Sequence, residues 1–216
     1  MIEMTLREIA DVVGGTLHDV PDPEVRVTGS VEFDSRRIGS GDLFLALPGE
    51  HVDGHDYAPA AIAAGAPAVL SARPVGVPAI VVAPNPGSVP SSSVALSGDS
   101  DGSGAAVLAA LADLARASVQ RLTAAGSLTV IGVTGSSGKT STKDLLAAVL
   151  APLGPVVAPP GSFNNELGHP WTGVGRPLTD SVRFLFFCSD FVPGAGRFRL
   201  GPHHQVATGK SLADIV

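Results

Sequence analysis

The chain has 216 residues, of which 44% are hydrophobic and 16% charged, so it is too apolar and too weakly charged for a disordered protein. A net charge of −6 argues against a general nucleic-acid-binding surface, and no apolar run approaches the ~20 residues of a transmembrane helix. The single cysteine, Cys188, excludes an internal disulfide and fits a reducing compartment. We therefore expect a cytoplasmic protein without nucleic-acid or membrane partners. A monomer is a separate expectation.

The first 85 residues predict a small α/β domain. Thr5 and Glu8 have the spacing of a capping box, and the apolar stripe that follows ends at Gly14, which together predict a helix. Further helical and extended patterns alternate along this part of the chain. The expected elements are an extended run over 25–33, strands over 43–47, 68–70 and 79–82, and a helix over 57–64.

A second α/β segment begins near residue 127. Before it, we assign residues 86–126 to a flexible loop rich in Pro, Gly, Ser and Asp, followed by a connecting helix. Residues 128–133 predict a buried strand, which leads through a glycine-rich turn into a helix over 140–150. Residues 156–158 are a candidate for the next parallel strand.

The glycine-rich turn has the composition of a phosphate-binding loop. Gly135 and Gly138 allow backbone N–H groups to approach phosphate oxygens, and the helix that follows adds N–H donors and a partial positive charge. Lys139 can reach the β- and γ-phosphates, and the Thr140 hydroxyl can bind Mg²⁺. Val133 stands where the strict motif has its first glycine, so a glycine-rich turn with an exposed lysine is the alternative interpretation.

These residues resemble the Mur ligases, the ATP-dependent amide-bond ligases of peptidoglycan precursor and cell-wall synthesis. The resemblance rests on six segments and covers residues 1 to about 172. Within the family, the patterns GSSGKTSTK and SFNNELG are similar to the type that joins D-Ala-D-Ala to UDP-MurNAc-tripeptide. The segments are Asp34–Arg36, Gly41–Gly49, Asp53–Tyr57, Ala63–Ala66, Gly132–Lys143 and Gly161–Pro170.

The resemblance implies a fold, a reaction and a set of site residues. The fold is a small UDP-binding α/β domain over residues 1–85, followed by an incomplete P-loop-type, parallel-sheet ATPase domain over 127–172. The reaction uses ATP and Mg²⁺ and proceeds through an acyl phosphate. Lys139 would stabilise the transferring phosphoryl group and Thr140 would hold Mg²⁺. The other nucleotide-binding residues would be Gly135, Ser136, Ser137, Gly138, Ser141, Asn164, Asn165 and Glu166.

Substrate contacts in the N-terminal domain are assigned to Ser35 and Arg36, because an Arg can donate two hydrogen bonds to a phosphate or a uracil edge. The alternative there is an Asp-Ser turn with a solvent-exposed Arg. Likewise, a polar turn with an Asn cap is the alternative for residues 164–166. We interpret His55 as a surface or capping histidine rather than a catalytic one.

The resemblance ends after Trp171 and Thr172. Residues 173–216 hold five of the eight phenylalanines and show no regular period, and the family's remaining central strands and C-terminal domain have no counterpart. One hypothesis is a frameshifted end of the chain. We therefore expect little or no ligase turnover from this chain alone.

Three other functions stay open at the level of sequence. The chain could be a Mur ligase of the type that adds a single amino acid. It could also be a P-loop kinase or NTPase, which would need an Asp such as Asp190 for Mg²⁺. A non-catalytic UDP-sugar-binding module is the third. The pattern Asp34-Ser35-Arg36 counts against a simple NTPase.

Overall fold

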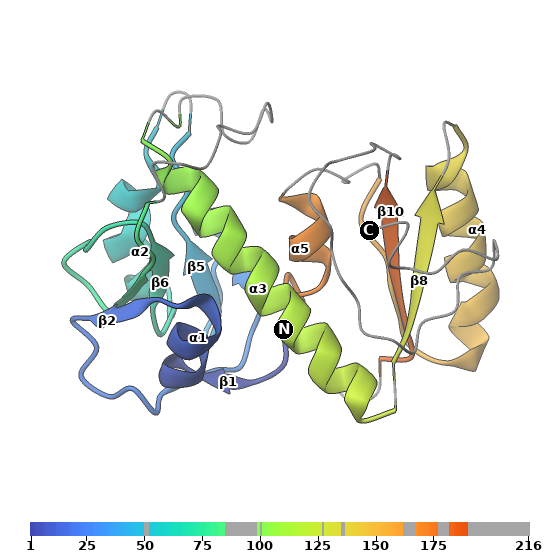
Figure 1. The fold of residues 1–216 in the computed structure, drawn as a ribbon, viewed down its shortest axis with the longest axis horizontal. Helices are drawn as coiled ribbons and strands as arrows, with labels where there is room; N and C mark the ends of the chain where they lie inside the picture. Colours follow the sequence, from blue (N-terminus) through green and yellow to red (C-terminus); the bar gives the residue numbers. More distant parts are fainter. Residues whose placement is uncertain are drawn as a thin grey trace. The chain divides into compact units, whose positions relative to one another are not determined.

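The computed structural model describes residues 1–49, 52–84, 99, 101–126, 128–134, 137–161, 167–176 and 182–189 (Figure 1). These residues divide into two compact units. The first comprises those within Met1–Ala115 and Val174–Pro177, and the second those within Arg116–Gly173 and Leu178–Val216. Among the described residues, no helix combines the length and the hydrophobicity that crossing a membrane requires.

The first unit is built on a five-stranded sheet with the order β2-β7-β6-β5-β4. Neighbouring strands from β4 to β7 run parallel, and β2 is antiparallel to β7. A separate antiparallel pair joins β1 to β3. The strands are β1 (Met4–Thr5), β2 (Thr16–His18), β3 (Arg26–Val27), β4 (Val31–Glu32), β5 (Leu43–Leu45), β6 (Val69–Ser71) and β7 (Ala79–Val81).

The helices of this unit follow local signals in the sequence. Helix α1 (Leu6–Val13) begins at the predicted capping box, in which the Thr5 hydroxyl accepts from the Glu8 N–H at 3.1 Å, and ends at Gly14 in the left-handed region. Helix α2 (Ala58–Ala63) follows a short 3₁₀ helix, η2 (Gly54–Tyr57). Another 3₁₀ turn, η1 (Ser35–Arg37), follows β4.

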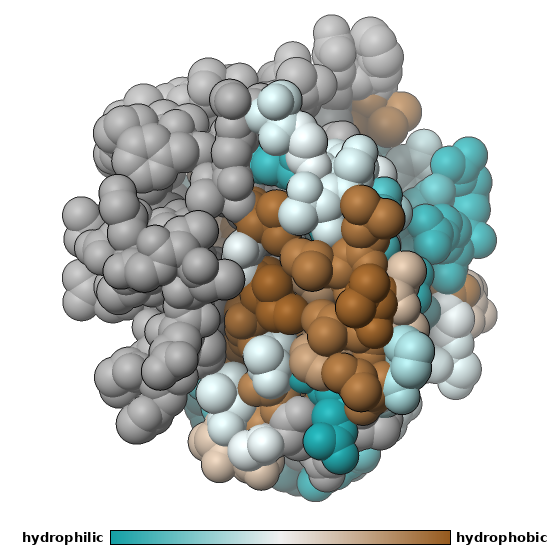
Figure 2. Space-filling view, turned by 90° about the vertical axis from the view of Figure 1, so that its right-hand side faces the viewer, coloured by the Kyte–Doolittle hydropathy of each residue, from teal (hydrophilic) through white to brown (hydrophobic). Residues whose placement is uncertain are grey.

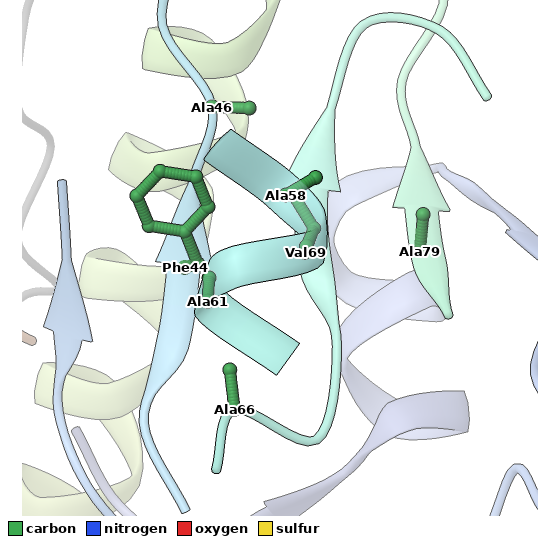
Figure 3. Packing of buried hydrophobic residues seen from close by; sticks show 7 residues of the cluster. All are labelled: Phe44, Ala46, Ala58, Ala61, Ala66, Val69 and Ala79. Atoms are coloured by element: carbon green, nitrogen blue, oxygen red, sulfur yellow. The ribbon is translucent and has the colours of Figure 1, made fainter. Parts of the chain in front are cut away.

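Small side chains dominate one core of the first unit. Phe44 of β5 lies among alanines from α2 and the strands, and Figure 3 shows its ring beside α2. Ala58 and Ala61 let the helix approach the sheet closely, and the single large ring fills the remaining volume. The cluster consists of Phe44, Ala46, Ala58, Ala61, Ala66, Val69 and Ala79.

The extended run expected over residues 25–33 is divided between two sheets. At the break, the Asp42 carboxylate accepts hydrogen bonds from the Ser30 N–H at 2.6 Å and the Ser30 hydroxyl at 3.0 Å. Strand β3 pairs with β1, whereas β4 joins the main sheet. The Val31 N–H also donates to the Val174 carbonyl at 3.0 Å, which ties residue 174 to the first unit.

Helix α3 (Ser103–Ala124) confirms the helix expected after the Pro- and Gly-rich segment. Its start is capped by Asp99, which accepts from the Gly104 and Ala105 N–H groups at 2.9 Å. The two units divide within α3, after Ala115, whereas the sequence interpretation starts the second domain at residue 127. Most of the segment expected to be a flexible loop lies outside the described residues.

The second unit holds a parallel sheet with the order β8-β10-β9. Its elements are β8 (Thr129–Thr134), α4 (Lys139–Leu150), the 3₁₀ turn η4 (Ala151–Leu153), β9 (Val156–Val157), α5 (Gly168–Thr172) and β10 (Phe184–Ser189). The strand and helix expected on either side of the glycine-rich turn, and the strand near residue 156, are all present. Strand β9 does not neighbour β8, however, because β10 lies between them.

Strand β10 comes from residues 173–216, the part of the chain whose sequence shows no regular period. It pairs with β8 in continuous register from Phe184↔Thr129 to Ser189↔Thr134. Leu185 and Phe186 are fully buried. Residues 184–189 are thus the central strand of the second sheet, and residues 190–216 lie outside the described part of the chain.

An apolar surface lies on the outer side of α4. Leu145 and Val149 are each 68% exposed, and Leu153 in η4 is 66% exposed. Figure 2 shows hydrophobic residues gathered in a contiguous area on the face of the molecule that carries α4. These residues follow one another at helical spacing, so they form one stripe rather than scattered positions.

Candidate functional site

The glycine-rich turn connects the carboxyl end of β8 to the start of α4. Gly138 is the N-cap of α4, with φ +78° and ψ −3° in the left-handed region. A Cβ placed on Gly138 would meet no atom within 4 Å, so this side of the turn is open. The Thr142 N–H donates to the Gly138 carbonyl at 2.9 Å and so closes the first helical turn. Gly135 and Ser136 lie outside the described residues.

The predicted residues on α4 occupy its first turn. Lys139 opens the helix, and Lys139 and Thr140 are both half-buried, while Ser137 and Ser141 are exposed. The start of a helix presents backbone N–H groups and a partial positive charge. A strand, a glycine turn and a helix that begins with Lys-Thr can therefore hold an anion with several oxygens, such as a polyphosphate.

The other predicted nucleotide residues, Asn164, Asn165 and Glu166, lie outside the described part of the chain. They follow β9, which runs parallel to β10 and hence in the same direction as β8. Loops after parallel strands gather at one edge of a sheet, where ligands of open α/β folds bind. Among the described residues, no group of three or more His, Cys, Asp or Glu side chains could hold a metal ion.

Lys143 belongs to this part of the fold and was not among the predicted site residues. Its side chain is buried, and its Nζ donates to the Pro159 carbonyl at 2.8 Å and to the Asp144 carboxylate at 2.5 Å. The sequence did contain a signal, because Lys139 and Lys143 are spaced to lie on the same side of a helix.

In the first unit, Asp34 caps η1 and binds Arg36. The Arg36 Nε and Nη2 donate to the two Asp34 carboxylate oxygens at 2.8 Å each, and the Arg36 N–H donates to Asp34 at 3.1 Å. The hydrogen bonds from the Arg36 side chain and backbone lower the pKa of Asp34 to about 2. The Arg36 side chain is 87% exposed, and Ser35 is half-buried. The guanidinium fork thus faces Asp34, and Nη1 is the nitrogen that this ion pair leaves unused.

His55 is buried, which differs from the surface position considered from sequence. Its Nδ1 lies 2.5 Å from the Asp53 carboxylate, and its Nε2 lies 3.3 Å from the Ala72 N–H. Since a backbone N–H can only donate, Nε2 accepts and Nδ1 faces the carboxylate as the donor. His55 therefore ties η2 to the residue after β6, and its burial supports a structural role.

Asp53 is half-buried and binds both His55 and Arg73. It accepts from the His55 N–H at 3.0 Å and from the Arg73 Nη2 at 2.9 Å. Partial burial raises the pKa of Asp53, but the hydrogen bonds from His55 and Arg73 outweigh it and bring the pKa to about 2. The carboxylate is therefore ionised at neutral pH.

One protein-family model matches the chain. It is described as "Mur ligase family, catalytic domain" and matches residues 28–118. The matched segment includes Ser35, Arg36 and most of α3, and it ends before β8 and the glycine-rich turn.

Curated relatives extend the similarity beyond that segment. A UDP-N-acetylmuramoyl-tripeptide--D-alanyl-D-alanine ligase of Mycobacterium tuberculosis is 66% identical over 175 residues, which cover 80% of this chain and 34% of the relative. The ligase of the same name from Bacillus subtilis is 38% identical over 185 residues, covering 86% of this chain and 36% of the relative. The chain thus spans about a third of the length of these relatives.

Solved structures agree with the sequence relatives. MurF from Acinetobacter baumannii matches with a TM-score of 0.63 at 27% identity, covering 87% of this chain and 36% of that one. MurF ligase from Thermotoga maritima, in complex with ADP, matches with a TM-score of 0.54 at 29% identity, covering 75% of this chain and 32% of that one.

Proposed function

Because the chain belongs to the Mur ligase family, we propose that it carries the nucleotide-binding and UDP-substrate-binding parts of a ligase that joins D-Ala-D-Ala to UDP-MurNAc-tripeptide. The observation that carries this proposal is the passage from β8 through Gly138 to Lys139 at the start of α4. The names of the relatives supply the substrates, and the ADP in the Thermotoga maritima structure supports nucleotide binding as part of the function.

The residues of the turn fit ATP and Mg²⁺. In this proposal Lys139 neutralises phosphate charge, and backbone N–H groups of Gly135–Ser141 bind phosphate oxygens. The Thr140 hydroxyl is an oxygen ligand of the kind that Mg²⁺ accepts alongside phosphates. ATP supplies the phosphoryl group that activates the substrate carboxylate as an acyl phosphate. Asn164, Asn165 and Glu166 complete the nucleotide site.

Titration with ATP and Mg²⁺ tests the nucleotide site. Removal of a charged hydrogen-bond donor costs about 1.5–3 kcal/mol, so Lys139→Ala should bind ATP at least ~10-fold more weakly than the wild type. Arg26→Ala is the matched control, because it also removes one positive charge, from an exposed side chain in the first unit. Equal binding by Lys139→Ala and the wild type would refute the proposed site.

The UDP-substrate site is proposed at Ser35 and Arg36. A UDP-sugar would contact Arg36 through Nη1 or displace Asp34 from the guanidinium fork. Titration with UDP-MurNAc-tripeptide should show binding by the wild type and weaker binding by Arg36→Ala. Retention of full affinity in that variant would place the substrate elsewhere.

Little or no ligase turnover is expected from these residues alone, since the chain spans about a third of its relatives. Phosphate release in the presence of both substrates measures turnover, and a rate near that of a complete ligase would contradict this expectation. Phosphate release without the UDP substrate would instead favour a simple NTPase. The proposal also holds that the chain is a cytoplasmic monomer, which cell fractionation and sedimentation can test.

A further inference from the structure

Lys143 is a buried cation that the proposed function does not use. Its side chain is only 3% exposed, whereas the Asp144 carboxylate that pairs with it is 63% exposed. Burial of an ammonium group costs free energy that its partners must offset. The buried partner is the Pro159 carbonyl, 2.8 Å from Nζ.

The position of this contact connects two parts of the second unit. Lys143 lies one helical turn after Lys139, so the two side chains emerge from the same side of α4. Pro159 follows β9 and directly precedes the segment that contains Asn164, Asn165 and Glu166. The Lys143 ammonium thus joins the helix that begins at the phosphate loop to the backbone that leads into that segment.

We propose that Lys143 is a positioning residue of the ATP site, acting through the Pro159 carbonyl. By holding Pro159 against α4, it fixes the carboxyl end of β9 relative to the helical turn that carries Lys139 and Thr140. This inference rests on the proposed ATP site. It gives a role to a buried charge whose ammonium donates to a buried backbone carbonyl.

Four forms of the full chain test the inference: the wild type, K143M, D144N and K139A. Met has the length of Lys without its charge or donors, so K143M should bind ATP about 3–10-fold more weakly, because ATP binding must then also order the end of β9 that Lys143 holds in the wild type. Its urea midpoint, followed by Trp171 fluorescence, measures the stability lost with the Pro159 contact, so ATP binding is compared at temperatures where both forms are folded. D144N is the matched control, because it removes the exposed partner and leaves the Pro159 contact, and it should bind ATP within about twofold of the wild type.

The outcomes separate this inference from the proposed function. Equal ATP binding by K139A and the wild type would overturn the nucleotide site itself. Weaker binding by K139A with unchanged binding by K143M would overturn only the role of Lys143. A loss in D144N as large as that in K143M would also overturn it, since the Pro159 contact would then be irrelevant.

Amide hydrogen exchange gives a readout that does not depend on the stability of a variant. In the wild type, ATP should slow exchange in peptides covering Val156–Gly161, because a nucleotide bound at the start of α4 should further restrict the end of β9 that Lys143 holds against that helix. In K143M without ATP, the same peptides should exchange faster. Exchange at Val156–Gly161 that ATP leaves unchanged in the wild type would overturn the inference even if K143M failed to fold.

Discussion

Alanine in place of Gly138 separates the conformational need for glycine from its role in binding. Gly138 has φ +78°, and a Cβ there would meet nothing within 4 Å. The only cost to folding is therefore backbone strain, about 1–2 kcal/mol for an L-residue in the left-handed region. Gly126, after α3 in the same unit, has φ +76° and equally open surroundings, so Gly126→Ala is a control matched in strain.

Both variants should lose about 1–2 kcal/mol of unfolding free energy in the second unit. Trp171, the only tryptophan, lies in α5 of that unit, so urea unfolding followed by its fluorescence measures the loss. ATP affinity should distinguish the two variants. The Gly138→Ala methyl group occupies the open side that phosphate oxygens would approach, which predicts a loss of about 10-fold or more, whereas Gly126→Ala should bind like the wild type.

Two results would contradict this reasoning. If Gly138→Ala bound ATP as tightly as Gly126→Ala, the open side of the turn would not face the phosphates. If Gly138→Ala lost far more stability than Gly126→Ala, the surroundings of Gly138 would be more crowded than the structure has them. Equal losses of stability with unequal losses of affinity are the expected pattern.

Three further changes test other features. Asp53→Asn should lower the stability of the first unit by about 1–2 kcal/mol at pH 7, since the folded state holds the pKa of Asp53 at about 2, below the value of 3.8 of an unperturbed Asp. That difference should shrink as pH falls below 4 and vanish near pH 2, as measured by circular dichroism in urea; a pH-independent difference would exclude the charge as its cause. The double variant Leu145→Lys, Val149→Lys should scatter less light at high protein concentration, because it breaks the exposed apolar stripe of Leu145, Val149 and Leu153. The free energy of unfolding should change little, since both substituted side chains are exposed. Unchanged scattering would show that this stripe does not cause aggregation. Phe186→Ala should lower the free energy of unfolding by about 3–5 kcal/mol, because the Phe186 side chain is fully buried. Phe184→Ala should lower it clearly less, because the Phe184 side chain is half-buried. Small and similar losses in both variants would mean that β10 is not a core strand.

Local chemistry made much of the fold predictable. The Thr5–Glu8 capping box and the left-handed Gly14 set both ends of α1 through contacts within a few residues. Strand β10 depends instead on pairing with Thr129–Thr134, which lies far away in sequence. Because that pairing leaves no periodic mark on a short apolar run, the order β8-β10-β9 could not be predicted from the sequence.

In the candidate site, too, the sequence predicts the features set by local structure and misses those set by tertiary packing. The position of Gly138 and Lys139 at the start of a helix follows from the motif and its flanking elements. The direction of the Arg36 side chain depends on the rotamers of Arg36 and Asp34, which spacing alone does not determine. The burial of His55 and Lys143 arises from tertiary packing against Ala72 and Pro159, so it was also beyond local prediction.

The place of β10 in its sheet constrains how the second unit can be assembled on the ribosome. Strands β8 and β9 leave the exit tunnel first, yet each forms its hydrogen bonds with β10 rather than with the other. Until Phe184–Ser189 has been synthesised, the nascent chain carries two edges with unmet hydrogen-bonding groups, which is a hazard for intermolecular pairing. A translational pause between β9 and β10 should therefore be more harmful than a pause after β10.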